Sequence, residues 1–369
     1  MDWEKERAVT AALIAMPHVG SRRMNQLIDA FGSAQAVWQA DFEAIKKAVP
    51  LPENMCQRWQ SWCRDYDFEQ AEQKRKNYGV QMVVWREEDY PPLLAQTYNP
   101  PSVLFYQGTL PESLHLIALV GSRKATPYGK NAARFLAREL SENQVYIVSG
   151  GARGIDTQAH TGALEGKAPT IAVMACGLDH TYPRENKKLF QEIVANGGCL
   201  MSEYPCGVKP LPQQFPARNR IIAGLSRAVV VVEAAERSGA LITSDFALEE
   251  GRDVFAVPGS IFASSSRGTN ELLKKGAAPV TEGQDILREY GWQMEKGQAK
   301  ETYSLDLQTE ALLALIPYDR GISREELLSQ ADWTPSALSL ALLQLTLAGL
   351  IEETLPGLYI RCARPFTSF

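Results

Sequence analysis

Apolar residues recur at helical spacing from residue 3 to residue 78, in short segments separated by proline and glycine. This pattern predicts a small domain made of helices over residues 1–78. Within it, residues 16–33 indicate a helix, a tight glycine-containing turn and a second helix with Ser21 as its N-cap. This order is typical of a SAM-like or helix-hairpin-helix (HhH) unit, whose turn amides bind a DNA phosphate. A helical packing module without a ligand explains it equally well.

The pattern changes over residues 79–290, where apolar strand-like runs alternate with amphipathic segments of helix length. The clearest runs cover residues 116–120, 145–149, 170–175, 228–233 and 253–258. This alternation predicts an α/β core, in which helices cover both faces of a parallel, doubly wound sheet. Ligands of such sheets bind beyond the carboxyl ends of the strands, so the residues that follow each run are candidates for chemistry.

The last zone, residues 305–369, follows a polar stretch and has the pattern of a winged-helix-like domain. Its expected elements are two short strands at the end, preceded by helices over residues 309–316, 323–331 and 334–348. Its charge is opposite to that of a typical DNA-binding winged helix, because it holds four Lys or Arg residues against eight Asp or Glu residues.

The third expected helix of this zone contains no charged residue and more leucines than one core-facing stripe needs. The stripe itself is supplied by Leu338, Leu342, Leu345 and Leu350. The surplus leucines are Leu340, Leu343 and Leu347. They predict an apolar surface that contacts protein rather than DNA.

Composition and charge narrow the class of protein. With 369 residues, 45% of them hydrophobic, the chain is long enough for two or three cores. No apolar run reaches ~18 residues and no cleavable signal pattern is present, so a soluble cytoplasmic protein is expected. Six cysteines without CxxC spacing and four scattered histidines predict reduced thiols and no metal site. The net charge of -5 confines any anion site to a local surface.

Glycine and arginine gather where three of the predicted strands begin or end. A Gly-Ser-Arg turn ending at Arg123 follows the first run, and two glycines with Arg153 follow the second. Arg218 and Arg220 precede the fourth run. Glycine turns at helix starts present free amides to an anion, and arginine binds phosphate through two hydrogen bonds. Ordinary connections with solvated arginines explain each turn taken singly, so the prediction of an anion site depends on their shared location.

Familiar nucleotide and catalytic motifs are absent from the sequence. Neither GxxxxGK[ST] nor GxGxxG is present, so neither ATP hydrolysis nor NAD chemistry is supported. Asp156, Glu233 and Asp245 lie near predicted strand ends or helix starts, but no His or Cys is paired with them by spacing. Helix caps and partners for the arginines are the better interpretation, with Asp156 capping the helix that follows the second run.

A resemblance to a known family is carried by six segments: ALVGSRKATPYG, IVSGGARGIDTQAH, TIAVMACGLDHTYPREN, MSEYPCGVKPLPQQFPARNRIIAGLS, VVVEAAERSGALIT and VFAVPGSIFASSSRGTNELLKKGA. In order and spacing they resemble the DNA-processing protein A family (DprA, also called Smf) over roughly residues 115–287. The helical front and the winged-helix-like tail are similar to that family's three-part layout only in kind. Gly151 stands where the family commonly has Leu, and Gln214 where Asn is common.

The resemblance implies a bacterial cytosolic protein that binds single-stranded DNA and loads the RecA recombinase onto it, notably in natural transformation. It also implies an extended Rossmann-like core, a homodimer, no cofactor and no catalytic activity. By motif, it places the DNA contacts at Ser122, Arg123, Arg153, Phe215, Arg218, Asn219 and Arg220. The arginines would bind phosphates, and Phe215 would stack on a base.

Two other functions compete with this one. A nucleotide N-glycosidase or phosphoribohydrolase is suggested by a related Rossmann-like family with the signature PGGxGTxxE. Here PGS at 258–260 and RGTNE at 267–271 are separate, and Glu233 lies elsewhere. A transcription factor that uses the winged helix conflicts with the acidic tail. The sequence therefore favours a single-strand DNA-binding mediator that is not an enzyme.

Overall fold

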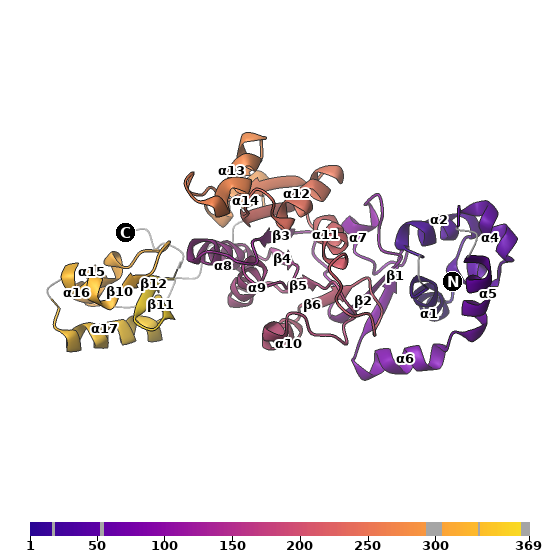
Figure 1. Ribbon diagram of the computed structural model, residues 1–369, viewed down its shortest axis with the longest axis horizontal. Coiled ribbons are helices and arrows are strands. Elements are labelled where there is room, and N and C mark those ends of the chain that lie inside the picture. The colour runs from indigo at the N-terminus through magenta and orange to yellow at the C-terminus, as the bar shows by residue number, and fades with distance from the viewer. Residues whose placement is uncertain (17–18, 52–54, 293–304, 331–332, 363–369) are drawn as a thin grey trace.

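The computed structural model describes residues 1–16, 19–51, 55–292, 305–330 and 333–362. A nine-stranded sheet occupies the middle of an elongated molecule (Figure 1). The N-terminal helices lie at one end of the sheet and the C-terminal segment lies at the other.

The described residues before Gly79 form helices around their own apolar core, as the sequence predicts. These helices are α1 (Trp3–Ile14), α2 (Ser21–Phe31), α3 (Ala34–Gln39), α4 (Phe42–Ala48), α5 (Met55–Asp65) and α6 (Phe68–Asn77). The expected N-cap at Ser21 is wrong. Gly20 is the N-cap in extended conformation, and Ser21 is the first helical residue. Whether this segment is a SAM-like or HhH domain stays a prediction.

The central sheet has the order β1-β2-β6-β5-β4-β3-β7-β8-β9. Its strands are β1 (Gln81–Val84), β2 (Val103–Gly108), β3 (Leu116–Gly121), β4 (Tyr146–Ser149), β5 (Thr170–Val173), β6 (Cys199–Ser202), β7 (Ala228–Glu233), β8 (Asp253–Ala256) and β9 (Ala278–Pro279). The five predicted strands are β3, β4, β5, β7 and β8, and from β6 to β9 all neighbours are parallel. The sequence did not predict β1 and β2, which extend one edge in antiparallel pairing.

Helices cover both faces of the sheet, which confirms the α/β class. They are α7 (Pro92–Ala95), α8 (Pro127–Glu142), α9 (Ile155–Glu165), α10 (Lys187–Ala195), α11 (Gln214–Leu225), α12 (Gly239–Glu249), α13 (Arg267–Lys274) and α14 (Gly283–Glu289), with 3-10 turns at Arg184–Asn186 and Ser264–Ser266. One face packs on α7, α11 and α12, and the other on α8, α9 and α14. All six residues of β7 are buried between these layers, which explains its unbroken apolar run.

The chain reverses direction across the sheet at β3. From β3 it proceeds outward through β4, β5 and β6, and then it returns to place β7 on the other side of β3. The turns after β3, β4 and β7 therefore meet at one edge, at the position where open α/β sheets bind ligands.

The C-terminal segment forms three helices and a small antiparallel sheet of order β10-β12-β11. Its elements are α15 (Leu307–Leu315), β10 (Ile322–Ser323), α16 (Arg324–Gln330), α17 (Pro335–Leu347), β11 (Ile351–Leu355) and β12 (Leu358–Arg361). Each expected helix and both strands are present; β10 was not predicted. Its assignment as a winged helix stays a prediction.

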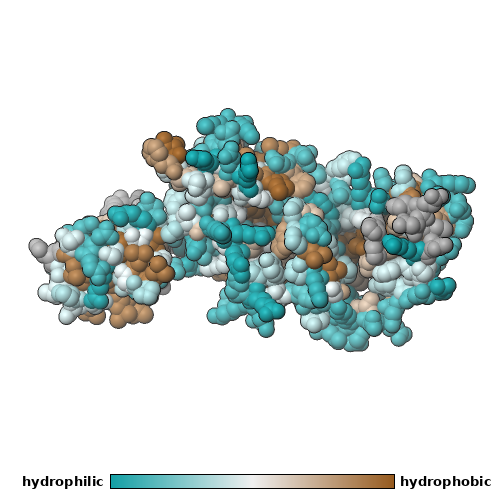
Figure 2. All heavy atoms as spheres, in the orientation of Figure 1, coloured by the Kyte–Doolittle hydropathy of each residue, from teal (hydrophilic) through white to brown (hydrophobic). Residues whose placement is uncertain are grey.

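The distribution of leucines along α17 follows the expectation from the sequence. Leu338, Leu342 and Leu345 are buried, whereas Leu340, Leu343 and Leu347 are 59%, 55% and 79% exposed. Figure 2 shows the resulting apolar surface on this part of the molecule. The surplus leucines are therefore available for a contact outside the C-terminal segment.

Candidate nucleic-acid interface

The turns after β3 and β4 are held together by their backbones. The Ser122 amide donates to the Glu233 carbonyl at the end of β7 (2.8 Å), and the Ile155 amide donates to the Ser122 carbonyl (3.2 Å). Gly154, between the turn after β4 and α9, has a φ of 78° and packs so closely against Ser122 and Arg123 that a Cβ would overlap their backbone. Only glycine permits this approach, which brings Arg123 and Arg153 to the same edge.

An exposed arginine and an aromatic ring form the centre of this edge. The guanidinium carbon of Arg123 lies 4.7 Å from the ring centroid of Phe215, at the start of α11. The ring of Tyr182 lies 5.4 Å from that of Phe215, tilted by 57°, and Tyr182 is 40% exposed. Cation–π contact orients the guanidinium over the ring without neutralising it. The edge therefore presents a free positive charge beside two aromatic rings.

Arg153 is the second exposed cation of this edge. Its side chain is 63% exposed and pairs through two nitrogens with Glu185, with Nη2 to Oε2 at 3.0 Å. The hydrogen bond from Arg153 lowers the pKa of Glu185. Both groups face solvent, where an ion pair contributes little to stability and exchanges readily for another anion.

Arg218 is buried, so its position gives no support to the prediction that it contacts a DNA phosphate directly. It is 3% exposed, and its Nη1 donates to the carbonyls of Gly150 (2.6 Å) and Val173. Asp156 lies beside it and is buried as well. Burial lowers the pKa of Arg218 to about 10, against the opposing effect of Asp156. Its guanidinium fastens the ends of β4 and β5 to α11 and has no open face left for a ligand.

Arg220 and Asn219 also point away from solvent in whole or in part. Arg220 forms an ion pair with Glu203, and its Nη1 donates to the carbonyl of Asn99 (2.9 Å). Asn219 is half-buried and accepts a hydrogen bond from Nε of Arg218 (3.3 Å). A direct contact of Arg220 with phosphate is thus unsupported too. Consecutive residues of a helix face different directions, so the charged motif divides between the interior and the open edge.

Carboxylates of the protein occupy both helix starts at this edge. Asp156 accepts from the Ala152 amide (3.2 Å), and it lies in the first turn of α9 after the N-cap Gly154, so its expected role as N-cap residue is wrong. Glu233 is buried and accepts from the amide of Thr126 (3.2 and 3.3 Å) and from its hydroxyl, at the start of α8. Such helix starts otherwise bind the phosphate of a nucleotide. Anion binding here therefore depends on side chains that project from the edge.

Of the seven predicted residues, the structure brings Ser122, Arg123, Arg153 and Phe215 to the open edge. Tyr182 joins them, although no sequence pattern predicts a role for it. Its segment, HTYPREN, was part of the resemblance, but a single tyrosine in a loop gives no signal of its own. Exposure and the neighbouring Phe215 ring identify it only in the folded chain.

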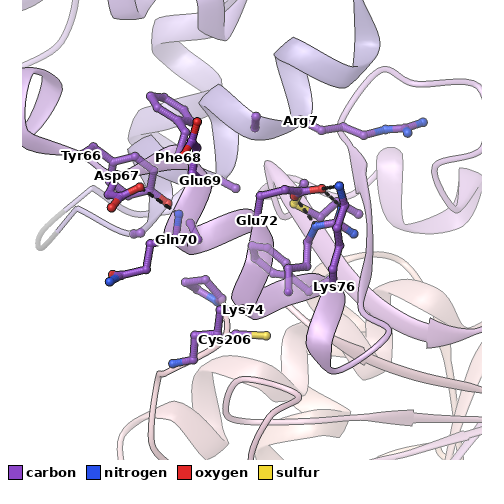
Figure 3. A pocket seen from close by; sticks show the side chains of 18 of the residues that line it. Arg7, Tyr66, Asp67, Phe68, Glu69, Gln70, Glu72, Lys74, Lys76 and Cys206 are labelled. Atoms are coloured by element: carbon purple, nitrogen blue, oxygen red, sulfur yellow. Dashed lines mark hydrogen bonds and ion pairs between the residues drawn. The ribbon is translucent and has the colours of Figure 1, made fainter.

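A separate cleft lies away from this edge, between α6 and the strands β1 and β2 (Figure 3). It has a volume of about 1180 Å³. Several of its charged side chains are paired within the protein, for example Arg75 with Glu72 and Lys74 with Asp179. Because both signs of charge line it and cancel locally, the cleft indicates no class of ligand.

The part of the chain that the structure describes offers neither a metal site nor a membrane-spanning helix. There, no three His, Cys, Asp or Glu side chains gather in a way that would hold a metal ion. None of the helices described combines the length and the apolar character needed to cross a membrane.

Comparisons with known proteins agree with the resemblance. Residues 81–291 match the sequence model of the family DNA recombination-mediator protein A. The DNA processing protein DprA of Streptococcus pneumoniae is 48% identical over 205 residues, which are 55% of this chain and 72% of that protein. Protein Smf of Escherichia coli is 41% identical over 287 residues, 75% of this chain and 76% of that protein.

Solved structures show the same relationship. The X-ray structure of DprA from S. pneumoniae aligns with a TM-score of 0.67 at 34% identity, over 80% of this chain and 99% of that chain. DNA processing protein A from Helicobacter pylori, described by its unique single-stranded DNA binding mode, aligns with a TM-score of 0.52 at 33% identity, over 58% of this chain and 97% of that chain. On the length and specificity of these matches, the chain belongs to the DNA recombination-mediator protein A family.

Proposed function

We propose that this protein binds single-stranded DNA and loads the RecA recombinase onto it, as in natural transformation. The observation that carries the proposal is the exposed guanidinium of Arg123 over the ring of Phe215, beside exposed Arg153. Cations beside aromatic rings are the common design of sequence-tolerant single-strand sites, because every nucleotide offers a phosphate and a base face.

In this proposal, the open edge binds DNA in two ways, through its positive charges and through base stacking. Arg123 and Arg153 bind phosphates, and a phosphate replaces Glu185 at Arg153. Phe215 and Tyr182 offer faces to unpaired bases, which a duplex keeps stacked inside. Ser122 orients the first turn, since its Oγ accepts from the Lys124 amide (3.1 Å). Arg218 contributes indirectly, because its buried side chain holds the ends of β4 and β5 in place.

The RecA-loading role rests on family membership and on the recombination-mediator description of the family. The structure of the H. pylori relative is described by its single-stranded DNA binding mode, which supports single-stranded DNA as the ligand proposed here. We also propose, from the same membership, that the protein acts in the cytoplasm.

We further propose that the protein is not an enzyme. The competing glycosidase function needs a free carboxylate beside a bound nucleotide. Glu233 instead accepts hydrogen bonds from Thr126, and Asp156 lies buried against Arg218. Incubation with nucleoside monophosphates and detection of free base by chromatography test this directly. Release of base that an E233Q substitution abolishes would overturn the binding-only function.

A homodimer is part of the proposal. Ile261 and Phe262 follow β8 near the sheet edge formed by β9, and they are 77% and 92% exposed. Adjacent apolar side chains of this exposure favour burial against a second copy. A double substitution I261E/F262E should halve the mass measured by light scattering, whereas L355E, on the C-terminal segment, should not. An unchanged mass would place the dimer contact elsewhere.

The RecA role is tested by RecA filament formation on oligo-dT with and without this protein. The wild type should shorten the lag before filament growth. The double variant R123E/R153E should not shorten it, because the mediator no longer binds the strand. A wild type that binds oligo-dT and leaves RecA unaffected would confine the function to binding.

A further inference from the structure

Helix α8 carries the C-terminal segment, residues 305–362, here called the C-terminal module. The side chain of Asn131 attaches this module to α8 and is called its seat below. Nδ2 of Asn131 donates to the carbonyls of Tyr318 and Arg361, each at 3.0 Å. These carbonyls come from two different parts of the module. The guanidinium of Arg361 lies 4.8 Å from the Tyr318 ring, so the same two residues also contact each other. A single amide therefore fixes a defined point of the module on the core.

Helix α8, around the contact, and the C-terminal module carry charges of opposite sign. From residue 113 to residue 138 the chain has no acid, and the side chains of Lys130 and Arg134 project from α8. The module is acidic, with eight Asp or Glu residues against three Lys or Arg residues. Arg134 pairs chiefly with Glu165, and Glu352 of β11 adds a further attraction that raises the pKa of Arg134. The module, of net negative charge, is thus attached to the part of α8 that carries Lys130 and Arg134.

The basic face of α8 is continuous with the candidate interface. Lys124 directly follows Arg123, and Thr126 begins α8 immediately afterwards as its N-cap. Lys124 and Lys130 are both exposed, and neither has an ion-pair partner among the residues that the structure describes. Asn131, the seat of the module, is the next residue after Lys130. A strand that extended from Arg123 along α8 would meet the module at this point.

We propose that the basic face of α8 is a further contact for a polyanion, and that the acidic C-terminal module is a tethered competitor for it. The inference rests on the proposed function in taking single-stranded DNA as the polyanion. The module lies beside this face, held at Asn131, until a longer strand displaces it, so that short oligonucleotides bind the edge at Arg123 alone. Displacement also frees the module, with its exposed leucines, for a protein contact.

The test uses the full-length chain and two variants that loosen the seat without touching the interface. N131A removes both hydrogen bonds, and E352Q removes a negative charge of the module that attracts Arg134. E353Q is the matched control, because its carboxylate accepts from the Gly357 amide (2.6 Å) within the module's own hairpin. E352Q and E353Q change the net charge equally and occupy neighbouring positions.

Long oligo-dT is titrated against each form at several salt concentrations. N131A should bind at least about fivefold more tightly than the wild type, because it removes two competing hydrogen bonds. E352Q should also bind more tightly, because it removes a competing negative charge, and E353Q should bind like the wild type. In the N131A background, K130Q should flatten the salt slope by about 0.7, because one phosphate contact is lost. X-ray scattering should show an extended maximum dimension for N131A.

Suppose that the wild type, N131A and E352Q bind equally and that scattering shows an expanded N131A. This result would overturn the competition, because the released module would then leave the affinity unchanged. Equal binding with an unexpanded N131A would overturn the seat at Asn131. If no form binds oligo-dT, the proposed function falls, and polyphosphate of matched length decides the competition instead. Polyphosphate binding that N131A does not strengthen would overturn it.

Discussion

Arg218 and Asp156 lie side by side beneath the turn at Gly150, and both are buried. A Cβ built on Gly150 would lie 2.5 Å from Nη2 of Arg218 and 2.7 Å from Oδ2 of Asp156, so only glycine admits the pair there. The arginine comes from α11 and the carboxylate from α9. Together they join the ends of β4 and β5 to both helices. The buried pair thereby supports the exposed edge that carries Arg123, Arg153 and Phe215.

Removing one partner of this pair should destabilise the protein strongly. R218M leaves the Asp156 carboxylate without compensation, and the expected loss is about 3–5 kcal/mol in the free energy of unfolding. The double variant R218M/D156N should lose less than the sum of the two single variants, because the uncompensated charge is gone. Denaturant unfolding measures all three, with R288M as an exposed control. Strictly additive losses would show that the two side chains do not act as a pair.

Only the exposed arginines should contribute phosphate contacts, so the number of contacts should be smaller than the number of arginines in the sequence motifs. R123E and R153E should each flatten the log–log salt dependence of oligo-dT binding by about 0.7, and together by about 1.4. R64E, at an exposed arginine of α5, makes the same change in charge and should leave the slope unaltered. A slope that R123E and R153E also leave unaltered would remove both residues from the interface.

Phe215 should contribute affinity without contributing to the salt slope. Stacking involves the face of the ring, so F215A should cost about 1–3 kcal/mol of binding while the slope stays constant. F215W should retain most of the affinity. Thermal unfolding of F215A separates this role from packing, since the ring is only half-buried. A large loss of stability with unchanged affinity per folded molecule would assign Phe215 to the core.

His160 should make the protein sensitive to acid. It is buried, its Nδ1 lies 2.8 Å from the Thr170 hydroxyl, and burial lowers its pKa to about 3. The unfolded chain binds a proton below about pH 6.5, so stability should fall by up to about 1.4 kcal/mol per pH unit between pH 6.5 and pH 3. H160Q should lessen that slope, whereas H115Q, at an exposed histidine, should not. Parallel stability curves for the wild type and H160Q would contradict the assignment.

The sequence predicts those parts of the fold whose signal is local. Buried strands such as Ala228–Glu233 are unbroken apolar runs, and the leucines of α17 divide by helical period into buried and exposed sets. The strands β1, β2, β6 and β9 were not predicted; β9 has only two residues, and Cys199–Ser202 lacks the β-branched residues that mark a strand. Their pairing depends on the rest of the sheet, which no local pattern contains.

The candidate site was predictable in place but not in the orientation of its side chains. Glycine turns and arginines at strand ends pointed to the edge at which the structure brings Arg123, Arg153 and Phe215 together. The absence of acids around Arg218 suggested a free charge, yet its partner Asp156 comes from a distant part of the chain and reaches it only through the sheet. Exposure likewise separates Arg123 from Arg220, although both belong to motifs of the same resemblance. Folding thus turns part of the basic motif into structural support.

The most direct test of the central claim is a comparison of single-stranded and double-stranded DNA of equal length by fluorescence anisotropy. The claim is that Arg123, Arg153 and Phe215 form one edge that binds phosphates and unpaired bases together. The wild type should bind oligo-dT much more tightly than the duplex, and F215A should reduce that preference, because only an unpaired base reaches the ring. Equal affinity for both DNAs in the wild type, unchanged by F215A, would contradict the account.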